Sequence, residues 1–380
     1  MKDSVICTVG ASLLGNIMKG SLGEEAKRFY ENNNLHDLAK LLLRRNDPLN
    51  DRSLGAEINS MTSLVERGIV DFRENLFLFV SDTEEGAKIG EVLKIYFLEN
   101  KHGVDFKNVQ VVRIEGLKDS DEHEFKTKGL RNLVREMAKY SNQNLNRIVI
   151  NATGGYKAQI AYAVALGQAL KIPVCYRFER FNHMVTLPPL PITLDQEIYR
   201  KNKRVFALLD AAFDLELKDF LKMSGYRSWG EIDESLKMFL DRVHVDGKDL
   251  VALNPIALIY LESVEWDYSV IDDPIFYSQN PPEEKLVGFE IHGQKAVRKS
   301  EKIIEEISKL PWIDRLHLTG SSERHTGNGF KVSRSKDSVK IEITTEKGTL
   351  YMKAYCKYYS ERFLDAVARK IEEKLREILQ

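Results

Sequence analysis

The stretch NRIVINATGGYKAQIAYAVALGQAL, residues 146–170, decides the fold class of the first half of the chain. An apolar run that passes through a glycine-rich loop into a long amphipathic segment predicts a strand followed directly by a helix. Four similar apolar runs lie elsewhere in the first 180 residues, at 4–10, 75–81, 109–115 and 172–179. Apolar strands alternating with helices indicate an α/β fold with a doubly wound, mostly parallel sheet covered on both faces.

A chain of 380 residues exceeds the size at which one hydrophobic core usually stops growing. We expect the α/β domain to span residues 1–195 and to end at the proline-rich LPPLPI, 187–192. Residues 196–265 are mainly helical in pattern and predict a helical linker or a winged-helix module. Residues 266–380 contain a helix, three alternating runs and a final amphipathic helix, which predict a small α+β domain with a largely antiparallel sheet.

The composition is that of an ordinary water-soluble protein, with 43% hydrophobic and 30% charged residues. No apolar run reaches the roughly 18 residues that a membrane-spanning helix needs, and the first residues lead into a strand, so we expect no membrane partner and a cytoplasmic location. The three cysteines, Cys7, Cys175 and Cys356, lie far apart in apolar surroundings and are expected to fill the core. No metal-ligand spacing is apparent, so we expect neither a metal nor a resident cofactor.

Three loops that follow strands carry the residues of a candidate ligand site. In an open parallel sheet, ligands bind outside the carboxyl ends of the strands, where glycines and helix N-termini suit phosphate groups. The loops are not GxGxxG or GxxxxGK[ST], which gives no support to a dinucleotide enzyme or a nucleoside triphosphatase. Tight turns with no ligand remain an alternative. The candidate residues are Gly10, Ala11, Ser12, Leu13 and Asn16, then Ser81, Asp82 and Thr83, and then Asn151, Thr153, Gly154, Gly155 and Lys157.

The pair TVGASLLGN (8–16) and NATGGYKAQIAYAVALGQALKIPVCYRFE (151–179), followed by LPPLPI, resembles the CARF domain of effectors in type III CRISPR defence. The resemblance covers about residues 1–195. It implies a Rossmann-like fold and a homodimer with a two-fold symmetric pocket for cyclic oligoadenylate, most simply cyclic tetra-adenylate. It also implies that Ser12 and the backbone of Gly10 and Ala11 contact the activator while the 153–157 loop closes over it. Some such domains degrade their activator slowly, and the sequence leaves that ring-nuclease activity open.

Two nuclease signatures found in partners of such domains are weak in this chain. The Arg-x(4–6)-His pattern of a HEPN ribonuclease occurs only at Arg177 and His183, within the expected β-hairpin of the first domain, so we interpret it as coincidence. A restriction-type metal site could draw on carboxylates and a lysine that lie in a proline-rich, loop-like segment. These residues are Asp272, Asp273, Glu283 and Lys285.

The last ninety residues resemble the small RelE-type messenger ribonucleases, through a helix, Leu-Pro-Trp at 310–312 and strands rich in Lys, Arg and Tyr. Residues 293–380 hold 19 Lys and Arg against 13 Asp and Glu, a net +6 that suits a polyanion, although scatter of surface charge also gives such a difference. If Val339 and its alternate neighbours face the helices, a period of two puts a basic and aromatic set on the other face. That set is Lys340, Tyr351, Lys353, Tyr355 and Lys357.

Such a face can bind phosphates and stack bases, and it predicts cleavage of RNA without a metal by attack of the 2′-hydroxyl. The chain is therefore expected to be an effector that cyclic oligoadenylate activates to cut messenger RNA at the ribosome, which inhibits translation. The alternatives are a ligand-gated RNA- or partner-binding regulator without nuclease activity, a restriction-type nuclease, and a merely solvated sheet face. The expected catalytic residues are Lys331, Arg334, Lys353 and Tyr355, with Arg324 and His325 as a second set.

Overall fold

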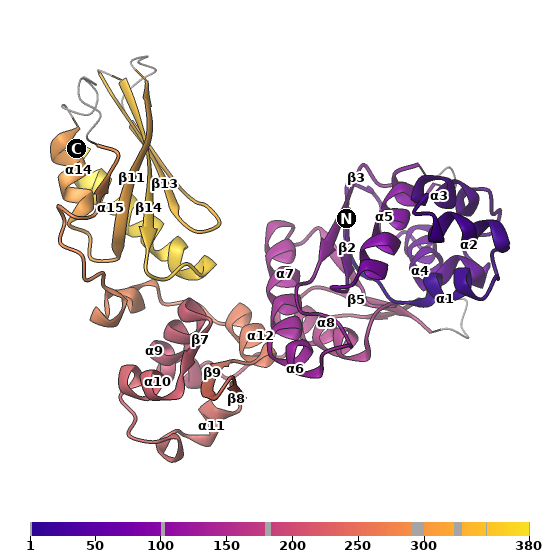
Figure 1. Cartoon of the computed structure of the whole chain (residues 1–380), viewed down its shortest axis with the longest axis horizontal. Helices are drawn as coiled ribbons and strands as arrows, with labels where there is room; N and C mark the ends of the chain where they lie inside the picture. Colours follow the sequence, from indigo (N-terminus) through magenta and orange to yellow (C-terminus); the bar gives the residue numbers. More distant parts are fainter. Residues whose placement is uncertain are drawn as a thin grey trace. The chain divides into compact units, whose positions relative to one another are not determined.

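The computed structural model describes residues 2–99, 103–178, 184–289, 300–322, 329–346 and 348–379. The chain divides into two compact units (Figure 1). The first unit comprises Met1–Asp195 together with Asn254–Val264. The second comprises Gln196–Leu253 together with Glu265–Gln380. The chain thus leaves the first unit at residue 195, returns to it for eleven residues, and leaves it again.

The first unit is built on a six-stranded sheet with the order β3-β2-β1-β4-β5-β6. Neighbouring strands are parallel except for β6, which pairs antiparallel with β5. The five strands expected from the apolar runs are all present, and the mixed α/β class with a parallel sheet is confirmed. The turn expected at 181–183 lies outside the described residues. The strands are β1 (Ser4–Thr8), β2 (Asn75–Val80), β3 (Asn108–Arg113), β4 (Ile148–Asn151), β5 (Val174–Arg177) and β6 (Met184–Leu187).

Helices pack on both faces of this sheet, as the continuous burial of β1 and β4 requires. On one face Val5, Cys7 and Leu78 pack into a core with the helices that precede and follow β2. On the other face the ring of Tyr140 contacts Phe77 and Phe79. The helical elements are α1 (Ser12–Met18), α2 (Glu24–Glu31), α3 (Leu35–Leu43), η1 (Arg52–Leu54), α4 (Gly55–Glu66), α5 (Glu84–Glu99), α6 (Glu122–Glu124), the π-helix η2 (Phe125–Gly129), α7 (Leu130–Gln143), α8 (Lys157–Ala169) and α12 (Pro255–Ser263).

Helix α12 is the returning segment, and it packs against α7 and α8. Its core residues Leu258, Ile259 and Leu261 are buried, and the Asn142 amide of α7 donates to Glu262 at 2.8 Å. The sequence placed these residues in a middle domain, because an apolar helix carries no signal of the surface it covers. The structure assigns them to the first unit.

The second unit begins with a small helix and strand module, residues 196–253. Its elements follow the order helix, strand, helix, helix, strand, strand, and its sheet has the order β7-β9-β8. The module therefore contains a small sheet as well as helices, so it is not a purely helical linker, which was one of the two forms expected. Its elements are α9 (Glu197–Ala212), β7 (Asp214–Glu216), α10 (Leu217–Ser224), η3 (Trp229–Glu231), α11 (Glu234–Lys237), β8 (Leu240–Val245) and β9 (Lys248–Leu253).

The rest of the second unit is a five-stranded sheet with the order β10-β11-β14-β13-β12, antiparallel except for the pair β10 and β11. The three strands expected from the alternating runs are β12, β13 and β14, whereas β10 and β11, which lies between β10 and β14, were not predicted from the sequence. The elements are η4 (Tyr268–Asp272), η5 (Pro274–Phe276), β10 (Leu286–Val287), α14 (Glu301–Ser308), β11 (Ile313–Ser322), β12 (Gly329–Arg334), β13 (Val339–Thr345), β14 (Gly348–Cys356) and α15 (Glu361–Leu379).

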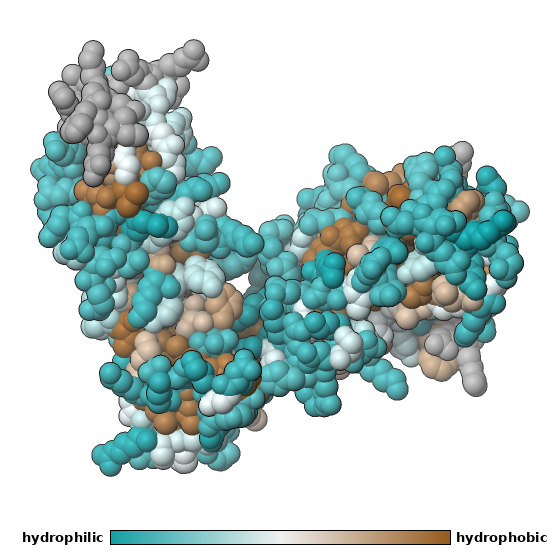
Figure 2. Space-filling model, in the orientation of Figure 1, coloured by the Kyte–Doolittle hydropathy of each residue, from teal (hydrophilic) through white to brown (hydrophobic). Residues whose placement is uncertain are grey.

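One core joins α9 to the five-stranded sheet within the second unit. Leu208 and Ala211 of α9 pack with Ile271, Phe276 and the inner face of the sheet. On the face in view in Figure 2, hydrophilic residues cover most of the surface of each unit and surround smaller hydrophobic patches. No helix among the described residues has the length and hydrophobicity that a membrane span requires. The cysteines carry free thiols; Cys7 and Cys175 are buried, and Cys356 is half-buried.

Candidate functional site

A pocket of about 370 Å³ lies at the carboxyl ends of β1 and β2 in the first unit. The strand order reverses at β1, since β2 lies on one side of it and β4 on the other. Open α/β sheets bind ligands at such a point, because the loops from the two directions diverge there. The lining residues are Val9, Gly10, Ala11, Leu14, Ser81, Thr83, Glu85, Gly86, Ile89, Asp119, Gly155 and Tyr156.

A buried carboxylate organises the first loop of this pocket. The Glu57 side chain of α4 is fully buried, and its Oε1 accepts the Gly10 N–H at 2.7 Å. Its Oε2 accepts the Ser12 hydroxyl at 3.3 Å, while Ser12 Oγ accepts the Ala56 N–H at 2.9 Å. Burial raises the pKa of Glu57, and the hydrogen bonds from Gly10 and Ser12 oppose that rise only in part. Glu57 therefore holds the loop after β1 in place from beneath.

Two glycines let the loops after β1 and β4 meet at backbone distance. A Cβ atom on Gly10 would lie 2.5 Å from the Gly155 nitrogen. A Cβ atom on Gly154 would lie 2.1 Å from Glu57 Oε1 and 2.8 Å from the Thr8 carbonyl oxygen. The Thr8 hydroxyl also donates to the Gly154 carbonyl at 2.6 Å. The sequence reasoning took these glycines to clear space for a ligand, but in the structure Gly10 and Gly154 clear space for each other's loops and for Glu57.

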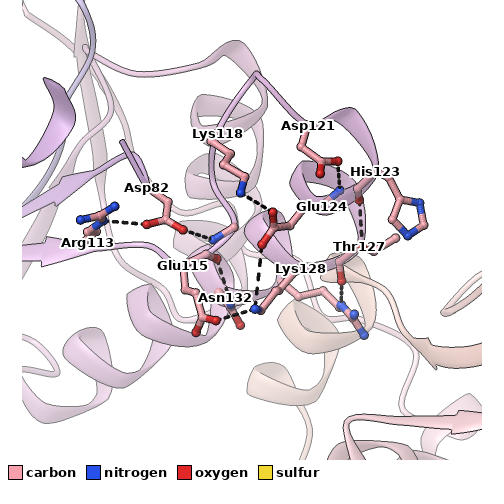
Figure 3. Close-up of polar contacts among 12 residues, drawn as sticks. Asp82, Arg113, Glu115, Lys118, Asp121, His123, Glu124, Thr127, Lys128 and Asn132 are labelled. Carbon is pink, nitrogen blue, oxygen red and sulfur yellow. Dashed lines mark hydrogen bonds and ion pairs between the residues drawn. The ribbon is translucent and has the colours of Figure 1, made fainter. Parts of the chain in front are cut away.

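The loop after β3 supplies another wall of the pocket through Asp119. Figure 3 shows the network of charges that holds the surrounding segment. Asp82 accepts from Arg113 Nε at 2.6 Å and from the Gly116 N–H at 2.9 Å, and these contacts, with the Gly116 N–H first, lower its pKa. Lys118 pairs with Glu124 at 2.5 Å, and Lys128 pairs with both Glu115 and Glu124. This wall is therefore held by ion pairs and hydrogen bonds in addition to the buried side chains of Ile114 and Leu117.

Five of the residues predicted for the ligand site line the pocket: Gly10, Ala11, Ser81, Thr83 and Gly155. The others support the loops or point elsewhere. Leu13 is fully buried in the core, and Asn16 donates to the carbonyls of Arg52 and Ser53. Asn151 is buried, donates to Ser60 at 2.8 Å and accepts from Thr153 at 2.6 Å.

The remaining predicted cation, Lys157, is exposed at the first position of α8 and does not line the pocket. The sequence reasoning also missed the acidic character of the pocket. Its described lining includes two carboxylates, Glu85 and Asp119, and neither lysine nor arginine. Glu85 lies two residues after the predicted Thr83, in the first turn of α5, so a signal was present, whereas no residue of the loop after β3 was predicted. The pocket suits hydrogen-bond donors such as amines and hydroxyls better than a phosphate.

A second candidate site is a groove of about 380 Å³ on the outer face of the five-stranded sheet. We call it the basic groove. The face expected from the alternation is present: Ile341 and Met352 are buried, while Lys340 and Tyr351 are exposed. The sequence reasoning did not name Thr319, Ser333 or Glu342, which the missed strand and the same alternation bring there. The lining residues are Thr319, Lys331, Ser333, Lys340, Ile341, Glu342, Tyr351, Met352 and Lys353.

The strand register orders the side chains of the outer face in rows. One row pairs Ser333 with Lys340, Lys340 with Lys353, and Lys353 with His317. The next row pairs Lys331 with Glu342 and Glu342 with Tyr351.

Beyond the groove, the Arg315 guanidinium lies 4.5 Å from the centre of the Tyr355 ring. Lys331, Lys353 and Tyr355 are thus on one face of the sheet, as expected.

Arg334 does not lie on that face. Its guanidinium contacts Glu361 at 2.7 Å and Asp365 at 3.0 Å, and both carboxylates belong to α15 on the inner side of the sheet. The expectation that Arg334 and Lys331 act at one site is therefore wrong in its geometry, because residues three positions apart on a strand point to opposite faces. Arg324 and His325 lie outside the described residues.

The residues suggested for a restriction-type metal site are not brought together. Asp272 pairs with Lys370 at 3.0 Å, and Asp273 pairs with Arg204 at 3.1 Å. Lys285 is buried and donates to the Leu310 carbonyl at 3.1 Å, and desolvation lowers its pKa. Within the described parts of the chain, no group of three or more His, Cys, Asp and Glu side chains could hold a metal ion.

Comparison with known proteins supports one broad assignment. Residues 52–190 match the family model described as CRISPR-associated protein (Cas_APE2256). This match supports the interpretation that the chain is a CRISPR-associated protein. It includes the loops after β2, β3 and β4 and the helix that carries Glu57, but not the loop after β1. The crystal structure of protein VC1899 from Vibrio cholerae is also similar, at 10% identity and a TM-score of 0.27, over 95% of this chain and 78% of that one.

Proposed function

We propose that the chain is a type III CRISPR effector that forms a homodimer and binds cyclic oligoadenylate through its first unit. Binding of this activator switches on metal-independent RNA cleavage by the second unit. The observation that supports the activator site is the pocket at the strand switch point. Its walls after β2, β3 and β4 lie within residues 52–190, which match a CRISPR-associated family model. Because Glu85 and Asp119 would repel phosphates, an adenine amine and ribose hydroxyls are assigned to the pocket. The phosphates are assigned to the exposed rim, near Lys157.

The basic groove supports the second half of this proposal. Lys331, Lys340 and Lys353 would bind the phosphate to be cleaved and stabilise the charge that develops on its oxygens. Tyr355, stacked with Arg315, would hold a neighbouring base. A single RNA strand, rather than a duplex, can lay both its backbone and its bases on such a face.

Helix α12 is the proposed route between the two activities. It packs against α7 and α8, and α8 begins directly after the 151–156 loop. Both ends of α12 continue into the second unit, at Leu253 and at Glu265. A ligand that favours one position of α8 over another would therefore bias α12 and, through it, both connecting segments.

The experiment that tests the proposal incubates the protein with translating ribosomes, with and without cyclic tetra-adenylate, and maps the cut ends of the messenger. Activator-dependent cuts that end in a 2′,3′-cyclic phosphate or a 3′-phosphate are expected, because attack by the 2′-hydroxyl leaves these ends. Binding of the activator with no cut would instead favour a ligand-gated regulator. In that case the exposed outer face of the sheet would bind RNA or a protein partner without cleaving it.

A further inference from the structure

Glu342 is the one carboxylate among the described residues that line the basic groove. It is half-buried on β13, opposite Lys331 on one side and Tyr351 on the other. Lys340 precedes it by two positions on the same face, and Lys353 lies diagonally across on β14. The four charged side chains therefore surround a common space on the sheet.

Glu342 lies opposite Lys331 in the register but forms no close ion pair with the lysines of the groove. Within the described parts of the chain, no ion pair joins Glu342 to Lys331, Lys340 or Lys353. The other side of the same sheet behaves differently, because Arg334 there contacts both Glu361 and Asp365. A carboxylate whose purpose is to offset charge is expected to form such pairs.

The lysines themselves are placed at a cost to stability. Lys340 and Lys353 are directly opposite each other in the register. Like charges in that position destabilise a sheet. Lys340 and Lys353 thus oppose each other, and Glu342 lies beside them without a close ion pair. This arrangement suits an anionic substrate, because the lysines can stabilise negative charge and the carboxylate can accept a proton.

We propose that Glu342 is the general base of RNA cleavage in the basic groove, a role that rests on the ribonuclease function proposed above. Glu342 takes the proton of a ribose 2′-hydroxyl, and the 2′-oxygen forms a bond to the adjacent phosphorus. The bond from phosphorus to the 5′-oxygen breaks, and that oxygen leaves with a proton from the Lys353 ammonium. The products are a 2′,3′-cyclic phosphate and a 5′-hydroxyl.

The spacing of the two residues fits these roles. Diagonal neighbours across an antiparallel pair are about 7–8 Å apart at their Cα atoms, which leaves room for a phosphodiester between the base and the acid. Lys331 and Lys340 flank that position and would stabilise the non-bridging oxygens.

The test compares the full-length wild-type chain with the Glu342→Gln variant in the presence of cyclic tetra-adenylate and translating ribosomes. Loss of a general base is expected to lower the single-turnover cleavage rate by about a hundred- to ten-thousandfold. Binding of a short RNA with a 2′-deoxyribose at the cut position is expected to be equal or tighter, because a negative charge leaves a phosphate site. Glu342→Asp should restore part of the rate. The rising limb of the pH–rate profile should be absent from Glu342→Gln.

The matched control is Glu346→Gln, which removes the same charge from an exposed position in the turn after β13 and should leave the rate unchanged. A Glu342→Gln variant that cuts at the wild-type rate overturns the assignment of the base. Parallel loss of RNA binding and cleavage in that variant would make the role structural and overturns it as well. Absence of cleavage by the wild-type chain would instead reject the proposed ribonuclease function.

Discussion

The two candidate sites are made in opposite ways. The pocket of the first unit is shaped by backbone atoms, since Gly10, Gly154 and the buried Glu57 fix its loops at contact distance. The basic groove of the second unit is shaped by side chains that stand on a regular sheet and leave Lys340 and Lys353 opposed. The first site should therefore be sensitive to added atoms and the second to lost charges. The following experiments test that difference.

The largest effect is expected from Gly154→Ala. Its methyl group would lie within 3 Å of Glu57, Thr8 and Gly10 atoms, and the last two contacts are to backbone, which no side-chain rotation relieves. We expect the first unit to lose about 3 kcal/mol of unfolding free energy, and activator binding with it. Thermal unfolding and calorimetry measure both. Gly15→Ala is the matched control, since nothing lies within 4 Å of its Cβ position on α1; it should stabilise the helix slightly.

Lys353→Ala should come next, with a loss of about a hundredfold in the rate of RNA cleavage and no loss of unfolding free energy. The ammonium that it removes is the proposed proton donor to the leaving 5′-oxygen, and its removal also relieves the repulsion from Lys340. Arg334→Ala is the comparison on the opposite face: it should lower stability through its lost contacts with α15 while leaving the rate unchanged. A rate loss in Arg334→Ala that matches that of Lys353→Ala would show that the face of the sheet does not matter.

A smaller effect is expected from Lys157→Ala on activator binding. A charge-assisted contact to phosphate contributes about 1.5–3 kcal/mol, which predicts roughly a ten- to hundredfold weaker binding of cyclic tetra-adenylate. Isothermal calorimetry checks this directly. Lys171 lies two residues after the end of α8, and its amine donates to the carbonyl oxygens of Leu190 and Ile192. Lys171→Ala should leave the affinity unchanged.

The smallest effect concerns pH. Burial raises the pKa of Glu57, so the folded first unit favours the protonated carboxyl. This contribution to stability is complete below the unfolded pKa of about 4.3 and is lost as the pH rises through the raised value of the folded state. Glu57→Gln should flatten this decline, measured by urea unfolding between about pH 4 and 8. Glu66→Gln, exposed on the same helix, should leave the slope as in the wild-type chain.

Much of the architecture was predictable because it depends on local period. The five strands of the parallel sheet follow from apolar runs, and the outer face of the C-terminal sheet follows from alternation in β13 and β14. Strand β11 was missed: the turn-like Leu-Pro-Trp before it marked a boundary, and its alternation is interrupted by irregular pairing around Asp314 and Thr319. Because β11 was not predicted, its residues His317, Thr319 and Arg315 could not be assigned to the outer face.

The sequence by itself determined the α/β class, the positions of the loops after the strands and the basic face of the last sheet. Each of these follows from periods and turns that act over a few residues. Only the tertiary structure decided that Glu57, more than forty positions from Gly10, supports the first loop, that Arg334 faces α15, and that α12 packs with the first unit. These contacts join segments distant in sequence, and burial at such a contact leaves no local pattern in the residues that make it.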